Sequence, residues 1–295
     1  MNGLRSAIGF LTILPLAPSH ANGSMSSARG WFPLVGLMIG AILVGIEFLL
    51  LLFLGLPEAG WYGYTSFTAA TFSHYTPSTL LWAALIVLTV VVLTRALHLD
   101  GFMDSCDALL GGFDRERRLE ILRDPHVGAF AVIGVVFLLL IKVVVVADLP
   151  VAWLPLMGPN RVAVLLLFPC LSRWAMLLTM ELYPYVRRNG LGTAFFSGDK
   201  ARFSKHLIFG FAFTLAVSVA LAGVVGIILL AAASVVAWAV GAWATRLLGG
   251  VTGDIYGAVN EMTEVIVLLL AIRLIDSSSF VIQSPLFELF WTAPQ

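Results

Sequence analysis

The segment that decides the fold of this chain is "LIFGFAFTLAVSVALAGVVGIILLAAASVVAWAVGAWATRLL", residues 207–248. It is apolar almost throughout, and a membrane helix needs only about 20 such residues. The segment therefore predicts two membrane helices divided near Gly223 and Gly226, or one long tilted helix. Overall, 60% of the residues are hydrophobic and 12% are charged, with a mean hydropathy of +0.97, whereas about a quarter of a soluble domain is charged. We predict an all-α, polytopic integral membrane protein.

Apolar stretches that are long enough to cross a bilayer predict a bundle of about seven transmembrane helices. They cover residues 31–54, 80–97, 128–147, 162–182, 207–225, 226–248 and 265–282. We expect residues 1–275 to form a single membrane-embedded domain. Residues 276–295 would be a C-terminal tail that lies outside or along the membrane interface. The first apolar run, near Arg5, also fits a secretory signal loosely, and this alternative stays open.

Basic residues indicate the orientation, because cytoplasmic loops collect Lys and Arg. They gather in the N-terminal segment and in the loops 98–127 and 183–206, whereas the loops 55–79 and 148–160 contain none. Arg161, at the edge of the second bare loop, is the exception. The N-terminus and the polar loops 98–127, 183–206 and 249–264 are therefore expected on the cytoplasmic side. Net charge is zero, so overall charge does not indicate nucleic acid as a partner.

The stretch "LHLDGFMDSCDALLGG", residues 97–112, concentrates acid at the end of an apolar run. On a helix, Asp104 and Asp107 each fall within about 40° of Asp100. Like charges repel, and carboxylates at membrane depth cost several kcal/mol each, so a cation should offset them. Mg²⁺ takes oxygen ligands and keeps water and substrate phosphates as further partners. The alternative is a solvated loop in which Asp100 or Asp107 only caps a helix.

Other polar residues extend this candidate site. Asp124 is a possible fourth carboxylate ligand, and His98 is a phosphate ligand, a proton relay or a structural residue. Arg offers paired donors to phosphate, which makes the arginines of the two basic loops candidates: Arg118, Arg123, Arg187 and Arg188. The loop 249–264 adds Gly253, Asp254 and Glu261 as candidate anion- or metal-binding residues, with a mobile connector as the alternative.

Ionisable residues inside the predicted spans also indicate function or pairing. Arg173 is expected to pair with an acid, Lys142 to reach towards the interface, and Glu47 to be a possible transport residue. Cys106 and Cys170 have no metal-ligand spacing, and both are interpreted as reduced and incidental.

The motifs "HLDGFMDSCDALLGG", "RRLEILRDPHVGAFA" and "LGGVTGDIYGAVNEMTEVIVLL" resemble those of the cobalamin synthase family, the adenosylcobinamide-GDP ribazoletransferases. Supporting matches are "AIGFLTILPL", "WFPLVGLMIG", "LSRWAM" and "RRNGLGTAF", in the expected order up to about residue 275. Ala108 and Ala131 stand where the family pattern has glycine, and Pro125 where serine is usual. Every acid of the motif is present.

The resemblance implies an enzyme of the last steps of cobalamin biosynthesis. The 3′-hydroxyl of α-ribazole, or of its 5′-phosphate, would attack the cobinamide-side phosphorus of adenosylcobinamide-GDP and expel GMP. Asp100, Asp104, Asp107 and Asp124 would hold Mg²⁺, arginines such as Arg118 and Arg188 would steady the phosphates, and an aspartate, with Asp107 the first choice, would accept the proton.

The resemblance also implies an inner-membrane location, with the active site facing the cytoplasm and other cobamide-assembly enzymes as possible partners. Two alternatives stay open. One is a CDP-alcohol-type phosphotransferase, whose acid spacing is similar, and the other is an ion or solute transporter that uses the acids as an ion path.

Overall fold

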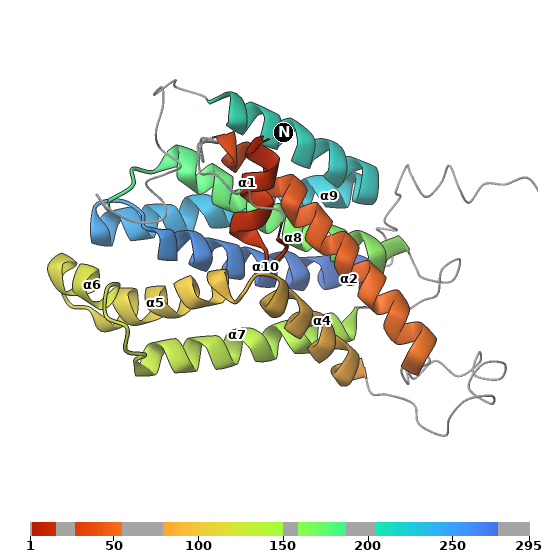
Figure 1. Cartoon of the computed structure of the whole chain (residues 1–295), viewed down its shortest axis with the longest axis horizontal. Helices are drawn as coiled ribbons and strands as arrows, with labels where there is room; N and C mark the ends of the chain where they lie inside the picture. The colour runs from red at the N-terminus through yellow and green to blue at the C-terminus, as the bar shows by residue number, and fades with distance from the viewer. Residues whose placement is uncertain (1, 16–26, 55–78, 150–158, 187–203, 277–295) are drawn as a thin grey trace, which may run out of the picture.

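The computed structural model describes residues 2–15, 27–54, 79–149, 159–186 and 204–276. This part of the chain is built from helices (Figure 1). They are α1 (Asn2–Leu11), the short 3-10 helix η2 (Arg29–Trp31), α2 (Phe32–Leu54), α4 (Thr79–Leu93), α5 (Leu97–Gly111), α6 (Arg115–Ile121), α7 (Ala129–Asp148), α8 (Pro159–Leu182), α9 (Lys205–Leu248) and α10 (Gly253–Asp276). The all-α prediction is confirmed.

Each of the seven predicted segments overlaps a helix in the described residues, which end at residue 276 within the last segment. Five helices in the described residues are long and apolar enough to cross a membrane, namely α2, α7, α8, α9 and α10, and the count rises to six if the bent pair α4 and α5 is one span. The remaining difference from seven lies in α9, whose 44 residues cover both the fifth and the sixth predicted segments. The tail beyond residue 276, and the proposal that it lies at the interface, fall outside the described residues.

The chain reverses inside α9, at Gly223. This residue has φ 55° and ψ −129°, a backbone conformation outside the helical region that glycine adopts readily. A Cβ on Gly226 would overlap the carbonyl oxygen of Ser218, although residues eight apart in a straight helix lie about 12 Å apart along its axis. The two halves of α9 therefore run back on one another, and the division predicted near Gly223 and Gly226 is confirmed.

The segment predicted as a single span over residues 80–97 is instead broken. α4 ends at Leu93, and α5 leaves it at an angle of 90°. Arg95 and Ala96 both have left-handed backbones, with φ 54° and 55°. The Ala96 nitrogen bonds to the Val91 carbonyl at 2.8 Å and the Arg95 nitrogen to the Val92 carbonyl at 3.1 Å, the pattern of a Schellman helix ending. No glycine marks this ending, which is why the sequence did not reveal it.

Two predicted loops are mostly helical. The loop placed at 98–127 contains α5 and α6, and the loop placed at 249–264 is only a tight turn, because α10 already begins at Gly253. Gly249 ends α9 with φ 81°, and Val251 pairs with the backbone of Pro184 and Val186. The sequence did not predict a helix at the start of α10, because its polar residues, which face the interior of the bundle, interrupt the apolar pattern of a membrane span.

The bundle is arranged around α8 and α10, with α2, α9, α5 and α7 about them (Figure 1). The end of α8 and the beginnings of α7 and α10 lie at the left of the view, beside α6 and the end of α5. This end also carries the charged residues 114–124, which the sequence places on the cytoplasmic side. α5 therefore ends on the side of the molecule that the sequence places in the cytoplasm.

Candidate active site on helix α5

The acidic stretch forms a helix, as predicted. α5 packs against α10 through small residues on one side, and Gly101, Ser105 and Ala108 are buried there. Asp100 and Asp104 lie one turn apart on a neighbouring side, where Asp100 is exposed and Asp104 is partly exposed. Side chains four residues apart on a helix have Cβ atoms about 5–6 Å apart. The structure thus leaves two carboxylates on an open face of a well-packed helix, which we call the acidic face.

Asp107, the third aspartate, is attached to α7. Its carboxylate accepts hydrogen bonds from the backbone nitrogens of Gly128 at 2.6 Å and Ala131 at 2.9 Å. These are N–H groups at the start of a helix, which lack partners within the helix. The alternative interpretation, that Asp107 caps a helix, is therefore correct. The helix that it caps is α7, and not α6, which follows α5 directly in the chain.

The contacts between α5 and α7 show that the acidic face lies alongside the first part of a membrane span. Asp107 meets the start of α7, and Cys106 lies against Gly134 further along, so the two helices run antiparallel. From Asp107 to Asp100 the helix rises about 10 Å, a third of the roughly 30 Å length of α7. The carboxylates therefore extend from the membrane entry of α7 into its depth.

The first turn of α10 lies directly against α5. A Cβ on Gly101 would come within 2.9 Å of the Asp254 carbonyl oxygen, and a Cβ on Gly257 within 2.6 Å of the His98 carbonyl oxygen. Only glycine permits this approach of the two backbones. This contact brings the backbone of Asp254, a predicted site residue, against Gly101 and so next to the acidic face. The Oδ2 of Asp254 accepts a 3.1 Å hydrogen bond from Thr252.

The predicted phosphate-binding arginines lie at the same end. Arg118 packs against Gly112 at the end of α5, and its Nε is buried with no hydrogen-bond partner among the described residues. Arg123 is exposed. Arg117, which was not a candidate, is paired with Glu120 at 2.6 Å. Arg187 and Arg188 lie outside the described residues, so their role stays a prediction.

Asp124 is bonded to a residue of its own loop. It is about half exposed and lies 2.5 Å from the ring of His126, whose backbone nitrogen also donates to it at 3.0 Å. These two hydrogen bonds lower the pKa of Asp124 below its ordinary value. In the described residues, Asp124 is therefore held by its own loop.

The described residues contain no group of three His, Cys, Asp or Glu side chains arranged to hold a metal ion, so the four predicted carboxylates do not form a preassembled cage. Asp100 and Asp104 nevertheless supply hard oxygen donors one turn apart on an exposed face. Mg²⁺ is commonly held by one or two carboxylates, with water and substrate phosphates as its other ligands. This donor pair fits such an ion.

Glu261 and His98 do not belong to the acidic face. His98 is buried between α5 and α10, and both of its ring nitrogens lack partners among the described residues. Glu261 lies about one helical turn further along α10 than Gly257 and forms a buried ion pair with Lys142. The position of His98 therefore gives no support to its predicted catalytic role, and the position of Glu261 gives none to its predicted binding role.

The intramembrane charges are paired inside the bundle. Lys142 does not reach towards the interface, because its side chain is buried and bonded to Glu261 and, at 2.7 Å, to Glu264. Arg173 pairs with Glu264 at 2.5 Å, as its expected acid partner. Glu47 forms a buried ion pair with Arg161, which contradicts the position of an unpaired transport residue. Sequence reasoning missed this last pair because Arg161 was interpreted as the edge of a loop.

Comparisons with known proteins agree with the helical motifs. The family model described as Cobalamin-5-phosphate synthase matches residues 3–272. The chain is 30% identical to the Adenosylcobinamide-GDP ribazoletransferase of Desulforamulus reducens, over 91% of this chain and 95% of that protein. It is 34% identical to the protein of that name from Desulfitobacterium hafniense (93% and 98% covered) and 36% to that of Pseudomonas paraeruginosa (91% and 97%). No solved structure matches the chain. The chain therefore belongs to the cobalamin-5-phosphate synthase family.

Proposed function

We propose that this chain is a membrane transferase that joins α-ribazole, or α-ribazole 5′-phosphate, to adenosylcobinamide-GDP. The 3′-hydroxyl oxygen of the acceptor forms a bond to the cobinamide-side phosphorus, and the bond from that phosphorus to the bridging oxygen of the diphosphate breaks, so that GMP leaves with this oxygen. The products are adenosylcobalamin, or its 5′-phosphate, and GMP. The names of the relatives and the match of the family over nearly the whole chain support this reaction.

The observation that carries the proposal is the pair Asp100 and Asp104, held on an open face of α5 beside the first turn of α10. We assign Asp100 and Asp104 as the ligands of Mg²⁺, with Asp254 beside them. Once bound, Mg²⁺ would neutralise charge on the diphosphate of the nucleotide substrate, which is a principal requirement of phosphoryl transfer.

The remaining roles follow from the positions of the side chains. The unpartnered Nε of Arg118 is suited to donate to a phosphate oxygen, together with Arg123 and the arginines at 187 and 188. Both oxygens of Asp107 accept backbone N–H groups, so its carboxylate orients α5 on α7. We therefore propose that Asp104, rather than Asp107, accepts the proton of the attacking hydroxyl.

The proposal includes a location. α5 ends beside α6 at the left of the view (Figure 1), where the sequence predicts the cytoplasmic side from its basic residues. The active site therefore faces the cytoplasm from the inner membrane, where water-soluble substrates reach it. Other cobamide-assembly enzymes that share this surface are the expected partners.

The experiment is GMP release by the purified protein from adenosylcobinamide-GDP with either acceptor, as a function of Mg²⁺ concentration. We expect release that requires both substrates and Mg²⁺, and a loss of at least a hundredfold in kcat for Asp104→Asn. Asp148→Asn is the matched control, because Asp148 is an exposed carboxylate at the opposite end of α7, and it should retain activity.

Two outcomes would contradict the proposal. If a folded wild-type protein releases no GMP with either acceptor, the transferase assignment is wrong, and CDP-alcohol substrates become the next candidates, followed by ion flux. If Asp148→Asn loses as much activity as Asp104→Asn, the acidic face has no special role.

A further inference from the structure

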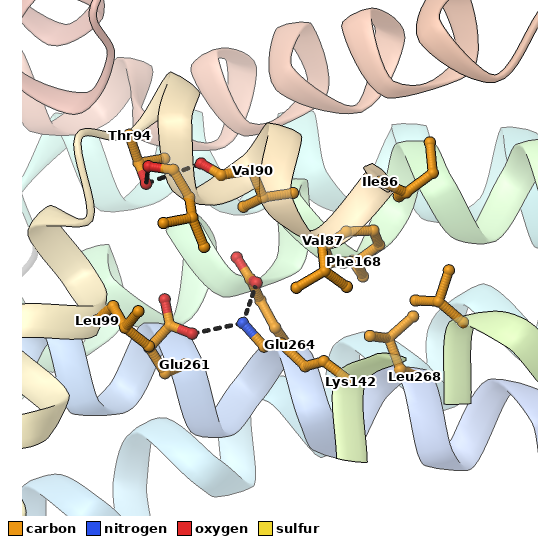
Figure 2. Close-up of a pocket in the computed structure, with 12 residues that line it drawn as sticks. Ile86, Val87, Val90, Thr94, Leu99, Lys142, Phe168, Glu261, Glu264 and Leu268 are labelled. Atoms are coloured by element: carbon orange, nitrogen blue, oxygen red, sulfur yellow. Dashed lines mark hydrogen bonds and ion pairs between the residues drawn. The ribbon is translucent and has the colours of Figure 1, made fainter. Parts of the chain in front are cut away.

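One carboxylate in the interior of the bundle contacts two other helices at once. Glu264, on α10, accepts hydrogen bonds from Lys142 of α7 at 2.7 Å and from Arg173 of α8 at 2.5 Å. Ser172 at 3.3 Å and Asn260 at 3.2 Å also donate to it. Its side chain is completely buried. Glu264 is thus the point at which α7, α8 and α10 are joined by charge, and Figure 2 shows its contact with Lys142 of α7.

The buried charges around Glu264 balance. Two carboxylates, Glu261 and Glu264, face two cations, Lys142 and Arg173. A pair of this kind is costly to break, because the remaining partner keeps an uncompensated charge away from water. Figure 2 shows Lys142 lying between the two carboxylates. The cavity beside them has a volume of only about 10 Å³, room for about one water molecule, so the surrounding side chains leave the cluster little freedom to move.

The same helix that carries Glu264 also packs against α5, on the side next to the acidic face. Ten residues earlier, Asp254 lies against Gly101, and Gly257 lies against the backbone of His98. The separation along α10 is about 15 Å, and a helix transmits an axial shift over that length with little loss. Because these contacts are between backbones, no flexible side chain lies between α10 and α5 to absorb such a shift.

The helices α5, α7 and α10 therefore form a closed arrangement. Asp107 joins α5 to α7, Lys142 joins α7 to Glu261 and Glu264 of α10, and Gly101 and Gly257 close the third side between α10 and α5. These three sides contribute to the position of Asp254 against Gly101, next to Asp100 in the chain. The ion cluster is the side furthest from the solvent.

We propose that Glu264 is a positioning residue for the acidic face: by bonding Lys142 and Arg173 together, it fixes α10 so that Asp254 and the first turn stay in register with α5. This inference rests on the proposed function for its activity readout. Glu264 does not touch substrate or metal. Its loss should loosen the metal and diphosphate site rather than remove a ligand from it.

The test compares two variants. Glu264→Gln keeps the shape of the side chain and leaves one uncompensated positive charge, so we expect a lower Tm. Glu264→Gln combined with Arg173→Met restores charge balance without restoring the contact between α10 and α8, so its Tm should recover towards wild type. For both variants we expect Mn²⁺, used in place of Mg²⁺, to bind at least fivefold more weakly in an EPR titration with adenosylcobinamide-GDP present and the acceptor omitted.

In the GMP-release assay we expect the half-saturating Mg²⁺ concentration to rise at least fivefold in both variants. Glu47→Gln is the matched control, because it breaks the other buried ion pair, with Arg161 between α2 and α8, at a distance from the acidic face. It should lower Tm but leave Mn²⁺ binding and kcat unchanged.

The outcomes separate the two proposals. Wild-type Mn²⁺ binding in the double variant, once its Tm has recovered, overturns the positioning role and leaves Glu264 a stabilising residue only. The double variant decides this even if Glu264→Gln alone fails to fold. A wild-type protein that binds Mn²⁺ and releases no GMP contradicts the proposed function, while the Mn²⁺ titration still tests Glu264.

Discussion

The carboxylate of Asp107 on α5 lies 2.6 Å from the backbone nitrogen of Gly128, which begins α7. These residues are separated by the whole of α6 and its flanking turns, so the contact sets the position of the acidic helix on a membrane span. A Cβ at position 128 would itself approach an Asp107 oxygen to 2.6 Å, closer than real side chains allow.

Gly128→Ala should therefore displace Asp107 from the start of α7. We expect a loss of about 1–3 kcal/mol in the free energy of unfolding, the usual cost of overpacking, and at least a tenfold fall in kcat. Thermal unfolding and GMP release would be measured together. Gly45→Ala on α2 is the control, because its Cβ would meet nothing within 4 Å. Equal behaviour of the two variants would contradict the role of the Asp107–Gly128 contact.

The bend between α4 and α5 predicts a stabilising substitution. Ala96 has φ 55°, a conformation that costs a non-glycine residue about 1–2 kcal/mol. Ala96→Gly should therefore raise Tm, partly offset by the greater freedom of the unfolded chain. Ala231→Gly, at an exposed helical position of α9, should instead lower stability by about 1 kcal/mol. If both substitutions lower Tm, the left-handed backbone at Ala96 carries no penalty.

Arg95 beside it is held by α1, because its guanidinium donates to the carbonyl oxygens of Thr12 at 2.8 Å and Gly9 at 3.3 Å. Arg95→Ala loses these hydrogen bonds and keeps the left-handed backbone, whereas Arg95→Gly loses the bonds and relieves the backbone. We expect Arg95→Gly to be more stable than Arg95→Ala by about 1 kcal/mol, measured by thermal unfolding. The reverse order would show that side-chain packing outweighs backbone strain at this bend.

Arg118 and Arg117 are neighbours in sequence with different surroundings. Arg117 pairs with Glu120 at the surface, while the Nε of Arg118 has no partner among the described residues. Arg118→Gln should raise KM for adenosylcobinamide-GDP about tenfold, which corresponds to roughly 1.4 kcal/mol. Arg117→Gln should leave KM within twofold of wild type. An equal effect of both would indicate general electrostatic attraction and no specific phosphate contact.

Glu47 distinguishes a structural pair from an ion path. It is completely buried beside Arg161, which also donates to the carbonyl oxygens of Leu149 at 2.8 Å and Val146 at 3.1 Å. Glu47→Gln leaves the guanidinium without its anion, and breaking a buried pair costs about 3–5 kcal/mol. We expect a large fall in Tm with kcat for GMP release retained. An unchanged Tm, together with lost ion flux in proteoliposomes, would favour the transporter alternative.

The sequence alone determined the fold class and the helical location of the acids. Apolar runs of about 20 residues indicate membrane helices, because a helix satisfies every backbone group inside a bilayer. The glycines at 223 and 226 marked where residues 207–248 could divide, and the structure decided between a division and one long helix. The spacing of Asp100, Asp104 and Asp107 likewise predicted one face of α5, since helical geometry is local.

Tertiary structure decided what each polar side chain does. Asp107 and Glu261 have the same chemistry as Asp104, yet one caps α7 and the other pairs with Lys142, and these partners lie 21 and 119 residues away. The bend at Arg95 and the early start of α10 at Gly253 also depend on packing against other helices. Local periodicity is a property of neighbouring residues, whereas the partner of a buried charge is chosen by which helices meet.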